Sequence, residues 1–475
     1  MHARALRVAP FLLAAALAGC AAPAGLSLPQ RRPLGADLET SMPPPADEPP
    51  AAPAAPDRRA EAPTGDLTLR QALAAALRGN PELAGFGWAV RQAEADEIQA
   101  AALPNPELEA EFENFAGSGE FRGSGALETT VTLSQVILLG EKRARQRALA
   151  AHDSRLAGWD YEAKRLDVLT AVAGQFVDVL AGQQKLALAQ EDLTLAESTF
   201  QTVEKRVDAG KASPMEKSKA AVERASGRVR AGRAERELAA ARQKLAALWG
   251  GREATFARAV GSLEQVAALP SVESLVARLS QNPQLARWSE EIARRRAALE
   301  WEKAQAVPDV TVGVGYRHFR GTPDNDRAML LTLGAPLPVF DQNRGGIARA
   351  RLGVLKAASD RHAAEVHARA ELEQSYQALA AAHAEAVALR DEILPAARQA
   401  FEAAQESFRQ GKAGYLDVLD AQRTLIEARQ EHAEALASYH QAVAALEGLT
   451  AQPLDPAPAP AAGPQPKETI DEAKN

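Results

Sequence analysis

The second half of the chain carries two aspartates, Asp417 and Asp420, whose spacing could place two carboxylates side by side. Residues three apart lie on one face of a helix, and clustered carboxylates attract cations and repel anions. A solvated pair of charges on a helix surface explains the same pattern without any function. These residues alone leave both interpretations open.

Other patterns that carry chemistry are weak in this sequence. His362 and His367 superficially resemble the histidine pair of a zinc-protease helix, but a spacing of five residues places them about 140° apart around the helix axis. The 8 histidines are scattered, the 4 methionines do not cluster, and no nucleophile elbow, phosphate loop or CxxC pair occurs. We therefore expect no metal site and no cofactor, and a protein that is not an enzyme.

Cys20 is the single cysteine, so no disulfide can form within one chain. It follows a short positive region and an apolar run over residues 8–18, which is too short to span a bilayer and is typical of an export signal. Leu17-Ala18-Gly19-Cys20 resembles the bacterial lipobox, in which the cysteine becomes the lipidated first residue of the mature protein. We expect residues 1–19 to be the signal peptide and Cys20 the lipid attachment site. Ala21, in place of aspartate, indicates sorting to the outer membrane.

The composition narrows the class of protein. Hydrophobic residues make up 46% of the chain but aromatic residues only 5%, and much of the apolar content is alanine, which favours long helices over a compact core. The formal charge of −7 provides no basic surface for nucleic acid. Residues 20–66 contain eleven prolines and no hydrophobic period, and residues 452–475 have the same character. We expect an extended tether and a disordered tail in these two segments.

Between these segments the sequence is duplicated. Asn80-Pro81-Glu82-Leu83 recurs as Asn282-Pro283-Gln284-Leu285, and Gly210-Lys211 recurs as Gly411-Lys412. The offsets are 202 and 201 residues, and the order of the landmarks is kept. Such self-similarity indicates two copies of one structural unit. We expect the units at residues 67–250 and 271–451, with a linker at 251–270.

Each unit contains a predicted β-hairpin. In the first strand Leu108, Ala110 and Phe112 alternate with four glutamates, and residues 127–134 repeat the alternation after a Gly/Ser-rich loop. Residues 310–316 and 329–333 form the equivalent hairpin of the second unit. Alternation of apolar and polar side chains with a period of two residues is typical of a strand with one apolar face and one face in water. A tilted transmembrane strand needs about 10 residues. We expect four strands per chain, although two hairpins packed on a soluble core would show a similar pattern.

Each hairpin is followed by a long predicted helix. Residues 141–209 lack proline and, at 1.5 Å per residue, would form a helix of roughly 100 Å. The counterpart at 344–410 contains Pro395, where we expect a kink or a break. Each helix ends at a glycine, Gly210 or Gly411, that favours a sharp reversal into a shorter returning helix. Helices of this length need neighbours along their whole course, as in a coiled-coil wall.

Four strands cannot close a barrel, and open sheet edges are not tolerated in lipid. Bacterial outer-membrane barrels have at least eight strands, and an eight-stranded interior is filled by side chains. Three chains would supply twelve strands, so a trimer is the smallest useful assembly. The polar strand faces would then line an aqueous bore, and we expect the first strand to contribute its acidic residues Glu107, Glu109, Glu111 and Glu113.

Two tandem units of helix, hairpin, long helix and returning helix resemble the TolC outer-membrane efflux family over residues 67–451. The resemblance is carried by Asn80–Leu83, Leu133–Gln135, Pro336–Asp341, Arg206–Pro214 and Gly411–Ala421. It implies a mainly α-helical protein with a transmembrane β part: a homotrimer with a twelve-stranded barrel and a barrel of long helices that extends into the periplasm. Arg206–Pro214 is most similar to the cobalt-zinc-cadmium branch of heavy-metal channels.

The resemblance also implies partners and sites. A periplasmic adaptor and an inner-membrane RND transporter would dock below the channel, and outer-membrane lipid would surround the strands. Asp417 and Asp420 match family aspartates that point into the periplasmic mouth, which implies a gate or a selectivity filter. The turns Gly210-Lys211 and Gly411-Lys412 would be the tips that contact the adaptor, unless they are ordinary helix caps.

The favoured function is therefore the outer-membrane exit duct of a tripartite RND-type efflux system of a Gram-negative bacterium, for heavy-metal cations or toxic small molecules. The same fold could serve type I protein secretion or multidrug efflux. A periplasmic coiled-coil spacer without a pore is a third interpretation.

Overall fold

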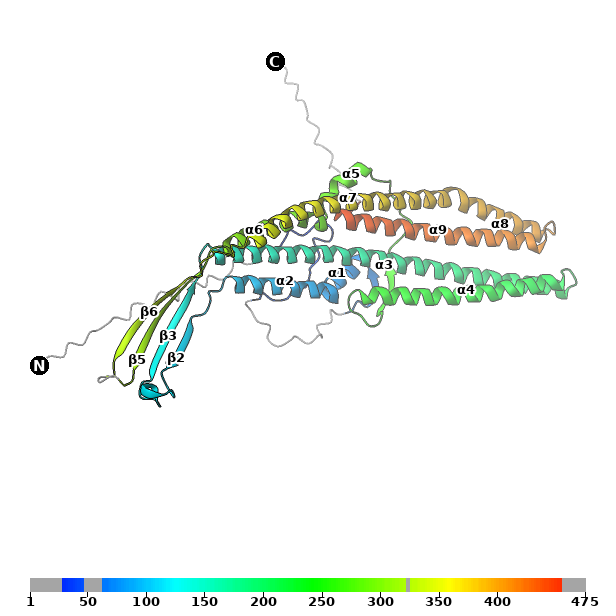
Figure 1. Cartoon of the computed structure of the whole chain (residues 1–475). Coiled ribbons are helices and arrows are strands. Elements are labelled where there is room, and N and C mark those ends of the chain that lie inside the picture. The colour runs from blue at the N-terminus through cyan, green and yellow to red at the C-terminus, as the bar shows by residue number, and fades with distance from the viewer. Residues whose placement is uncertain (1–27, 47–61, 322–324, 455–475) are drawn as a thin grey trace, which may run out of the picture.

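The structure, a computed structural model, describes residues 28–46, 62–321 and 325–454. It is an elongated layer of helices with a four-stranded sheet at one end and two helical turns at the other (Figure 1). The helices are α1 (Leu69–Gly79), α2 (Pro81–Ala100), α3 (Lys142–Asp208), α4 (Pro214–Ala247), α5 (Val272–Arg278), α6 (Pro283–Gln305), α7 (Arg344–Ala388), α8 (Leu394–Arg409) and α9 (Tyr415–Thr450). The strands are β1 (Gly65–Thr68), β2 (Glu107–Glu113), β3 (Glu128–Ile137), β4 (Phe256–Val260), β5 (Val310–Phe319) and β6 (Arg327–Gly334). Among the described helices, none combines the length and the apolar character needed to span a bilayer.

The two long helical segments behave as the sequence predicts. Helix α3 has 67 residues and is therefore about 100 Å long. Its counterpart is interrupted by a π-helical turn at Leu389–Ile393, after which Pro395 lies in the first turn of α8. Proline lacks the backbone N–H that an uninterrupted α-helix requires, so the break occurs where Pro395 would otherwise sit inside the helix.

The sheets correct the strand count. The predicted hairpins form one antiparallel sheet in the order β2-β3-β5-β6, but the described residues contain six strands in total. The two strands that the sequence analysis missed, β1 and β4, pair in parallel, with Leu67 opposite Ala259. Leu67 belongs to β1, and Thr68 caps the start of α1. Both strands are short and lie about 190 residues apart, so neither carries a strong local pattern.

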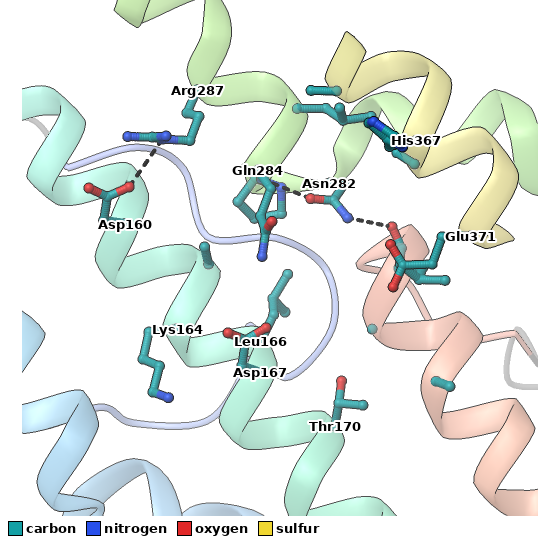
Figure 2. A pocket seen from close by; sticks show the side chains of 18 of the residues that line it. Asp160, Lys164, Leu166, Asp167, Thr170, Asn282, Gln284, Arg287, His367 and Glu371 are labelled. Carbon is teal, nitrogen blue, oxygen red and sulfur yellow. Dashed lines mark hydrogen bonds and ion pairs between the residues drawn. The ribbon is translucent and has the colours of Figure 1, made fainter. Parts of the chain in front are cut away.

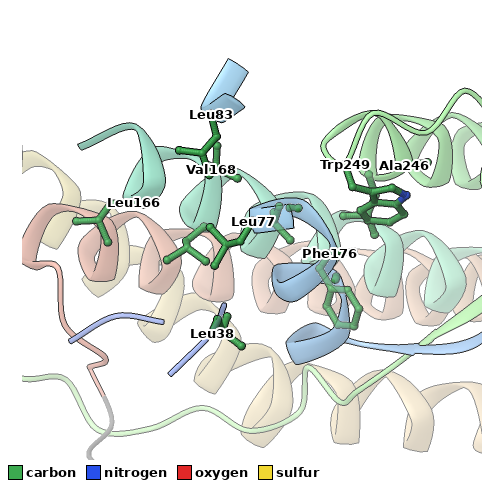
Figure 3. Packing of buried hydrophobic residues seen from close by; sticks show 14 of the residues in the cluster. Leu38, Leu77, Leu83, Leu166, Val168, Phe176, Ala246 and Trp249 are labelled. Atoms are coloured by element: carbon green, nitrogen blue, oxygen red, sulfur yellow. The ribbon is translucent and has the colours of Figure 1, made fainter. Parts of the chain in front are cut away.

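The main hydrophobic core surrounds the middle of α3. Leu77, Leu83, Val168, Phe176 and Trp249 are buried there (Figure 3). The cluster joins α1, α2 and the end of α4 to α3, and it includes Phe256 of β4. The four-stranded sheet contributes no residue to this cluster and projects from the far end of the helices (Figure 1).

Part of the predicted tether is ordered. Residues 28–46, which we call the strap, pack against the helices, and the side chain of Leu38 is buried in the main core. The prediction of an extended tether is therefore wrong for these residues. The strap contacts α1, α2 and α3 through isolated side chains and through its backbone groups. Such contacts require no regular spacing of apolar residues, so the sequence of the strap shows no hydrophobic period.

Candidate functional site

The four-stranded sheet has two faces of opposite character. Leu108 of β2 lies opposite Leu133 of β3, which lies opposite Val314 of β5, which in turn lies opposite Leu331 of β6. This row of apolar side chains is exposed: Leu108 is 73% and Leu331 is 78% accessible. The sheet therefore does not pack on a soluble core, and its exposed apolar face suits a lipid environment.

The other face of the sheet is polar. Glu107, Glu109 and Glu111 lie opposite Ser134, Thr132 and Thr130, and all three glutamates are exposed. Glu113 lies opposite Glu128, an arrangement of like charges that is destabilising unless a cation lies between them. All four predicted glutamates thus share one face, as the alternation of β2 predicts.

Arg317 of β5 supplies that cation. Its guanidinium lies 3.6 Å from Glu113 and 3.5 Å from Glu128, and its Nε donates to Thr130 Oγ1 at 2.8 Å. The sequence analysis missed this residue because the pairing of β3 with β5 joins the two repeats, and nothing in either hairpin predicts the register.

The structure places Asp417 and Asp420 in the first turns of α9, both exposed to solvent. The Asp417 carboxylate accepts a hydrogen bond from the backbone N–H of Gly414 at 2.8 Å. Asp417 therefore caps the start of α9, a role that sequence reasoning did not assign to it. Asp420 makes no such capping contact, and its side chain lies on the same helix face.

The two predicted tips have the same geometry. Gly210 and Gly411 have φ angles of +71° and +74°, the left-handed conformation that glycine adopts without strain. Lys211 N donates to Arg206 O, and Lys412 N donates to Ser407 O, each at 2.8 Å. These bonds close the C-termini of α3 and α8 in equivalent ways. Both turns lie at the end of the molecule opposite the sheet (Figure 1).

A buried charged network connects the helical hairpins between the tips and the main core. Glu223 of α4 is 5% exposed and accepts hydrogen bonds from Arg230 at 2.9 Å and from Arg423 of α9 at 3.0 Å. Burial alone would raise the pKa of Glu223, but these two arginines outweigh it and hold the pKa below its usual value. The network joins α4 of the first repeat to α9 of the second. Arg423 lies 200 residues from Glu223 in the sequence, so no local pattern indicates that the two residues meet.

Asp192 of α3 is a second buried carboxylate in this region, with 3% of its surface exposed. Burial raises the pKa of Asp192 to about 6, although Arg230 and Arg429 oppose the shift. The side chain therefore changes its charge in the mildly acidic range.

A recess of about 860 Å³ lies where α6 begins, between α3 and α7. Figure 2 shows Asp160 and Asp167 of α3 on one side of it and Glu371 of α7 on the other. Arg287 pairs with Asp160 at 3.0 Å, and burial raises the pKa of Asp160 and of Asp167. Within the described parts of the chain, no three His, Cys, Asp or Glu side chains are arranged to hold a metal ion. The remaining predicted site, Cys20, lies outside the described residues.

Comparison with known proteins gives consistent results. The family model described as "Outer membrane efflux protein" matches residues 72–251 and again residues 275–452. The cobalt-zinc-cadmium resistance protein CzcC of Cupriavidus metallidurans is 33% identical over 81% of this chain and 90% of its own length. The nickel and cobalt resistance protein CnrC of the same organism is 28% identical over 62% of this chain and 68% of its own length.

Solved structures show the same fold. A membrane protein from Pseudomonas aeruginosa matches with a TM-score of 0.68 and 18% identity, over 80% of this chain and 93% of that one. The outer membrane protein VceC of Vibrio cholerae matches with a TM-score of 0.65 and 18% identity, over 82% of this chain and 97% of that one. The expected similarity in sequence and the expected TolC-like fold are both confirmed.

Proposed function

Because the chain belongs to the outer membrane efflux protein family, we propose that it is the outer-membrane exit duct of a tripartite efflux system that exports heavy-metal cations. The observation that carries this proposal is the contrast between the two faces of the sheet. One face exposes Leu108, Leu331 and their neighbours, and the other carries a line of glutamates. A sheet with these faces suits a wall between lipid and water.

The free edges of the sheet support an assembly of several chains. Strands β2 and β6 each have one neighbour within the described chain, so two rows of backbone N–H and C=O groups remain unpaired. In lipid every such group needs a partner. Pairing of β2 in one copy with β6 in the next would satisfy both edges, and three copies would give a twelve-stranded barrel. The glutamates of β2 would then face the bore.

The helical part supports a conduit that reaches far from the membrane. Helix α3 extends about 100 Å from the sheet toward the tips. We propose that the turns at Gly210-Lys211 and Gly411-Lys412 meet a periplasmic adaptor, and that an inner-membrane RND transporter supplies the energy. Asp417 and Asp420 lie near the second tip, where three copies would form rings of carboxylates that favour cations. We further propose that Cys20 is lipidated, that no enzyme activity is present and that the protein binds no cofactor.

The choice of metal ions as cargo rests on the similarity to the cobalt-zinc-cadmium resistance protein CzcC, at 33% identity over 90% of its length. A strain that lacks this chain should lose tolerance to zinc, cobalt or cadmium and recover it when the chain is restored. Purified protein should form trimers and conduct cations across a planar bilayer. Monomers that pass no ions would overturn the channel, whereas loss of drug tolerance with unchanged metal tolerance would overturn only the cargo.

A further inference from the structure

The two hairpins of the chain are structurally equivalent at a constant offset of 202 residues. Glu109 of β2 lies opposite Thr132 of β3. The residues 202 positions later, Thr311 of β5 and Gly334 of β6, also lie opposite each other. The helices that follow the hairpins, α3 and α7, begin 202 residues apart as well. A contact that one repeat makes therefore predicts the contact available to the equivalent residues of the other repeat.

One such contact closes the base of the sheet within the chain. Lys142, the first residue of α3, pairs with Asp309, which directly precedes β5, at 2.8 Å. The Asp309 carboxylate also accepts a hydrogen bond from Leu139 N at 3.0 Å, and Gly140 packs against Val307. Lys142 is only 6% exposed. A cation at the start of a helix is unfavourable, and Asp309 offsets this effect.

The equivalent residues of the second junction lie at opposite edges of the sheet. Arg344 is the counterpart of Lys142, and Glu107 is the counterpart of Asp309. Glu107 begins β2 and Arg344 follows β6, and these are the two outer strands (Figure 1). Both side chains are exposed. Within the described part of the chain, Arg344 donates only to the side chain of Gln342, and Glu107 has no ion-pair partner. Each copy therefore presents one half of the junction at each edge.

The segment that joins β6 to α7 is exposed where its equivalent in the first repeat is covered. Leu337 is 81% and Phe340 is 101% accessible. The residues 202 positions earlier, Gln135 and Leu138, are both partly buried. Strand β3 has a neighbour on each side, whereas β6 has one neighbour within the described chain, which accounts for the difference.

The backbone of β6 is suited to a second neighbour. Successive residues of an antiparallel strand bond to neighbours on alternate sides. Phe319 N donates to Asp326 O, so the even-numbered residues of β6 bond to β5 and the odd-numbered residues face the free edge. Pro336 and Pro338 have even numbers, and proline is tolerated where its missing N–H does not face the pairing strand. Leu337, which lies between them, keeps its N–H for the free edge.

The pairing of β3 with β5 predicts the register at that edge. Gln135 of β3 lies opposite Val312 of β5. The equivalents of these two residues on the outer strands, 202 positions later and 202 positions earlier, are Leu337 and Ala110. In this register Leu337 and Val339 face the apolar residues of β2 and not its glutamates. The local hydrogen bond from Val339 N to Leu337 O, at 2.8 Å, would be exchanged for the new pairing.

We infer that the junction between Lys142 and Asp309 is repeated between copies, with Arg344 of one chain paired with Glu107 of the next. The partner at this edge is a second copy of the chain, held in the register that places Leu337 opposite Ala110. A slip by two residues would move the charges apart by about 7 Å, so the ion pair selects one register. This inference rests on the proposed assembly of several chains through β2 and β6.

Paired cysteines test the register. Opposite residues of an antiparallel pair have Cα atoms about 5.5 Å apart, within the range of a disulfide. We expect Leu337→Cys/Ala110→Cys to give disulfide-linked trimers on mild oxidation. Within one chain three strand spacings, or about 14 Å, separate the two outer strands, so the bond must join two copies. Ala335→Cys/Leu108→Cys, which is four residues out of this register, is the control and should cross-link about tenfold more slowly or less.

Reversal of the charges tests the ion pair. Glu107→Arg places two cations together and should raise the dissociation constant of the trimer about tenfold or more. Glu107→Arg/Arg344→Glu restores the attraction and should recover most of the loss. Glu109→Arg changes the next glutamate on the same face and should leave assembly near that of the parent. Dissociation is followed by sedimentation in detergent.

The outcomes separate this inference from the proposed channel. Conducting trimers that cross-link as fast through the control cysteines as through Leu337→Cys/Ala110→Cys would overturn the register and leave the channel intact. Parental assembly of Glu107→Arg, or no recovery in the reversed pair, would overturn the ion pair in the same way. Monomers that neither cross-link nor pass ions would overturn both the inference and the channel.

Discussion

Asn282 donates a hydrogen bond from its side-chain Nδ2 to the backbone carbonyl of Leu449 at 3.0 Å. The same side chain caps α6, because its Oδ1 accepts from Gln284 N at 2.8 Å. The start of α6 is thus joined to the end of α9. Asn80 makes the equivalent bond to Leu248 at 2.8 Å, which joins α2 to α4. In each repeat one asparagine thus bonds a backbone N–H at the start of one helix and a backbone carbonyl at the end of another, two groups that have no partner within their own helices.

We predict that Asn282→Ala lowers the free energy of unfolding by about 1–2 kcal/mol, because it removes the cap and leaves the Leu449 carbonyl without this donor. Chemical denaturation followed by circular dichroism measures the change. Asn282→Asp separates the two contributions, since aspartate still caps α6 but cannot donate to Leu449. Its stability should lie between those of the parent and the alanine variant. Equal stability of all three would show that the junction contributes nothing.

Asp192 should make stability depend on pH. The pKa of about 6 lies above the usual value, so the folded state binds a proton that the unfolded state has released between about pH 4 and pH 6. Protonated Asp192 therefore stabilises the folded state below about pH 4, and this contribution is lost as the pH rises through 6. We expect Asp192→Asn to be more stable than the parent at pH 7.5, by about 1–3 kcal/mol, with the difference vanishing near pH 4. Asp208→Asn, at an exposed position of the same helix, is the control. A difference that is independent of pH would contradict this assignment.

The acidic pair on α9 should influence ion selectivity. We predict that Asp417→Ala/Asp420→Ala lowers the cation selectivity of single channels. Since Asp417 also caps α9, this variant should lose about 1 kcal/mol of stability. Asp417→Asn/Asp420→Asn removes the same charges but keeps an acceptor for Gly414 N, so its stability should be closer to that of the parent. Reversal potentials in a salt gradient measure the selectivity, and unchanged values in both variants would remove the pair from the conduction path.

A change in the turn at Gly411 should weaken binding to the adaptor more than it weakens assembly of the trimer. Proline cannot adopt the φ of +74° that Gly411 has, so Gly411→Pro must rebuild the turn between α8 and α9. We expect weaker cross-linking to the adaptor while trimers persist. Lys412→Ala keeps the turn and serves as the control for loss of charge. Loss of the trimer in Gly411→Pro would instead indicate a purely structural role.

Local patterns account for most of the elements. The absence of proline over residues 141–209 predicts α3, Pro395 predicts the break before α8, and alternation of leucine with glutamate predicts β2 and its two faces. The glycines at 210 and 411 predict the reversals. Each of these features depends on residues within a few positions of one another, so one sequence contains the information directly.

The tertiary structure alone decided which distant residues meet. Arg317 lies between Glu113 and Glu128 because β3 pairs with β5 across the repeats, and Arg423 reaches Glu223 from a helix 200 residues away. The strap has no periodic pattern, yet Arg165 binds its backbone carbonyls, which every residue type possesses. Backbone groups leave no trace in the order of side chains, and contacts over long separations depend on packing that no local window contains. For this reason the sequence by itself determined the long helices, the two hairpins and the polarity of their faces, while folding determined the β1-β4 pair, the network between the helical hairpins and the position of the strap.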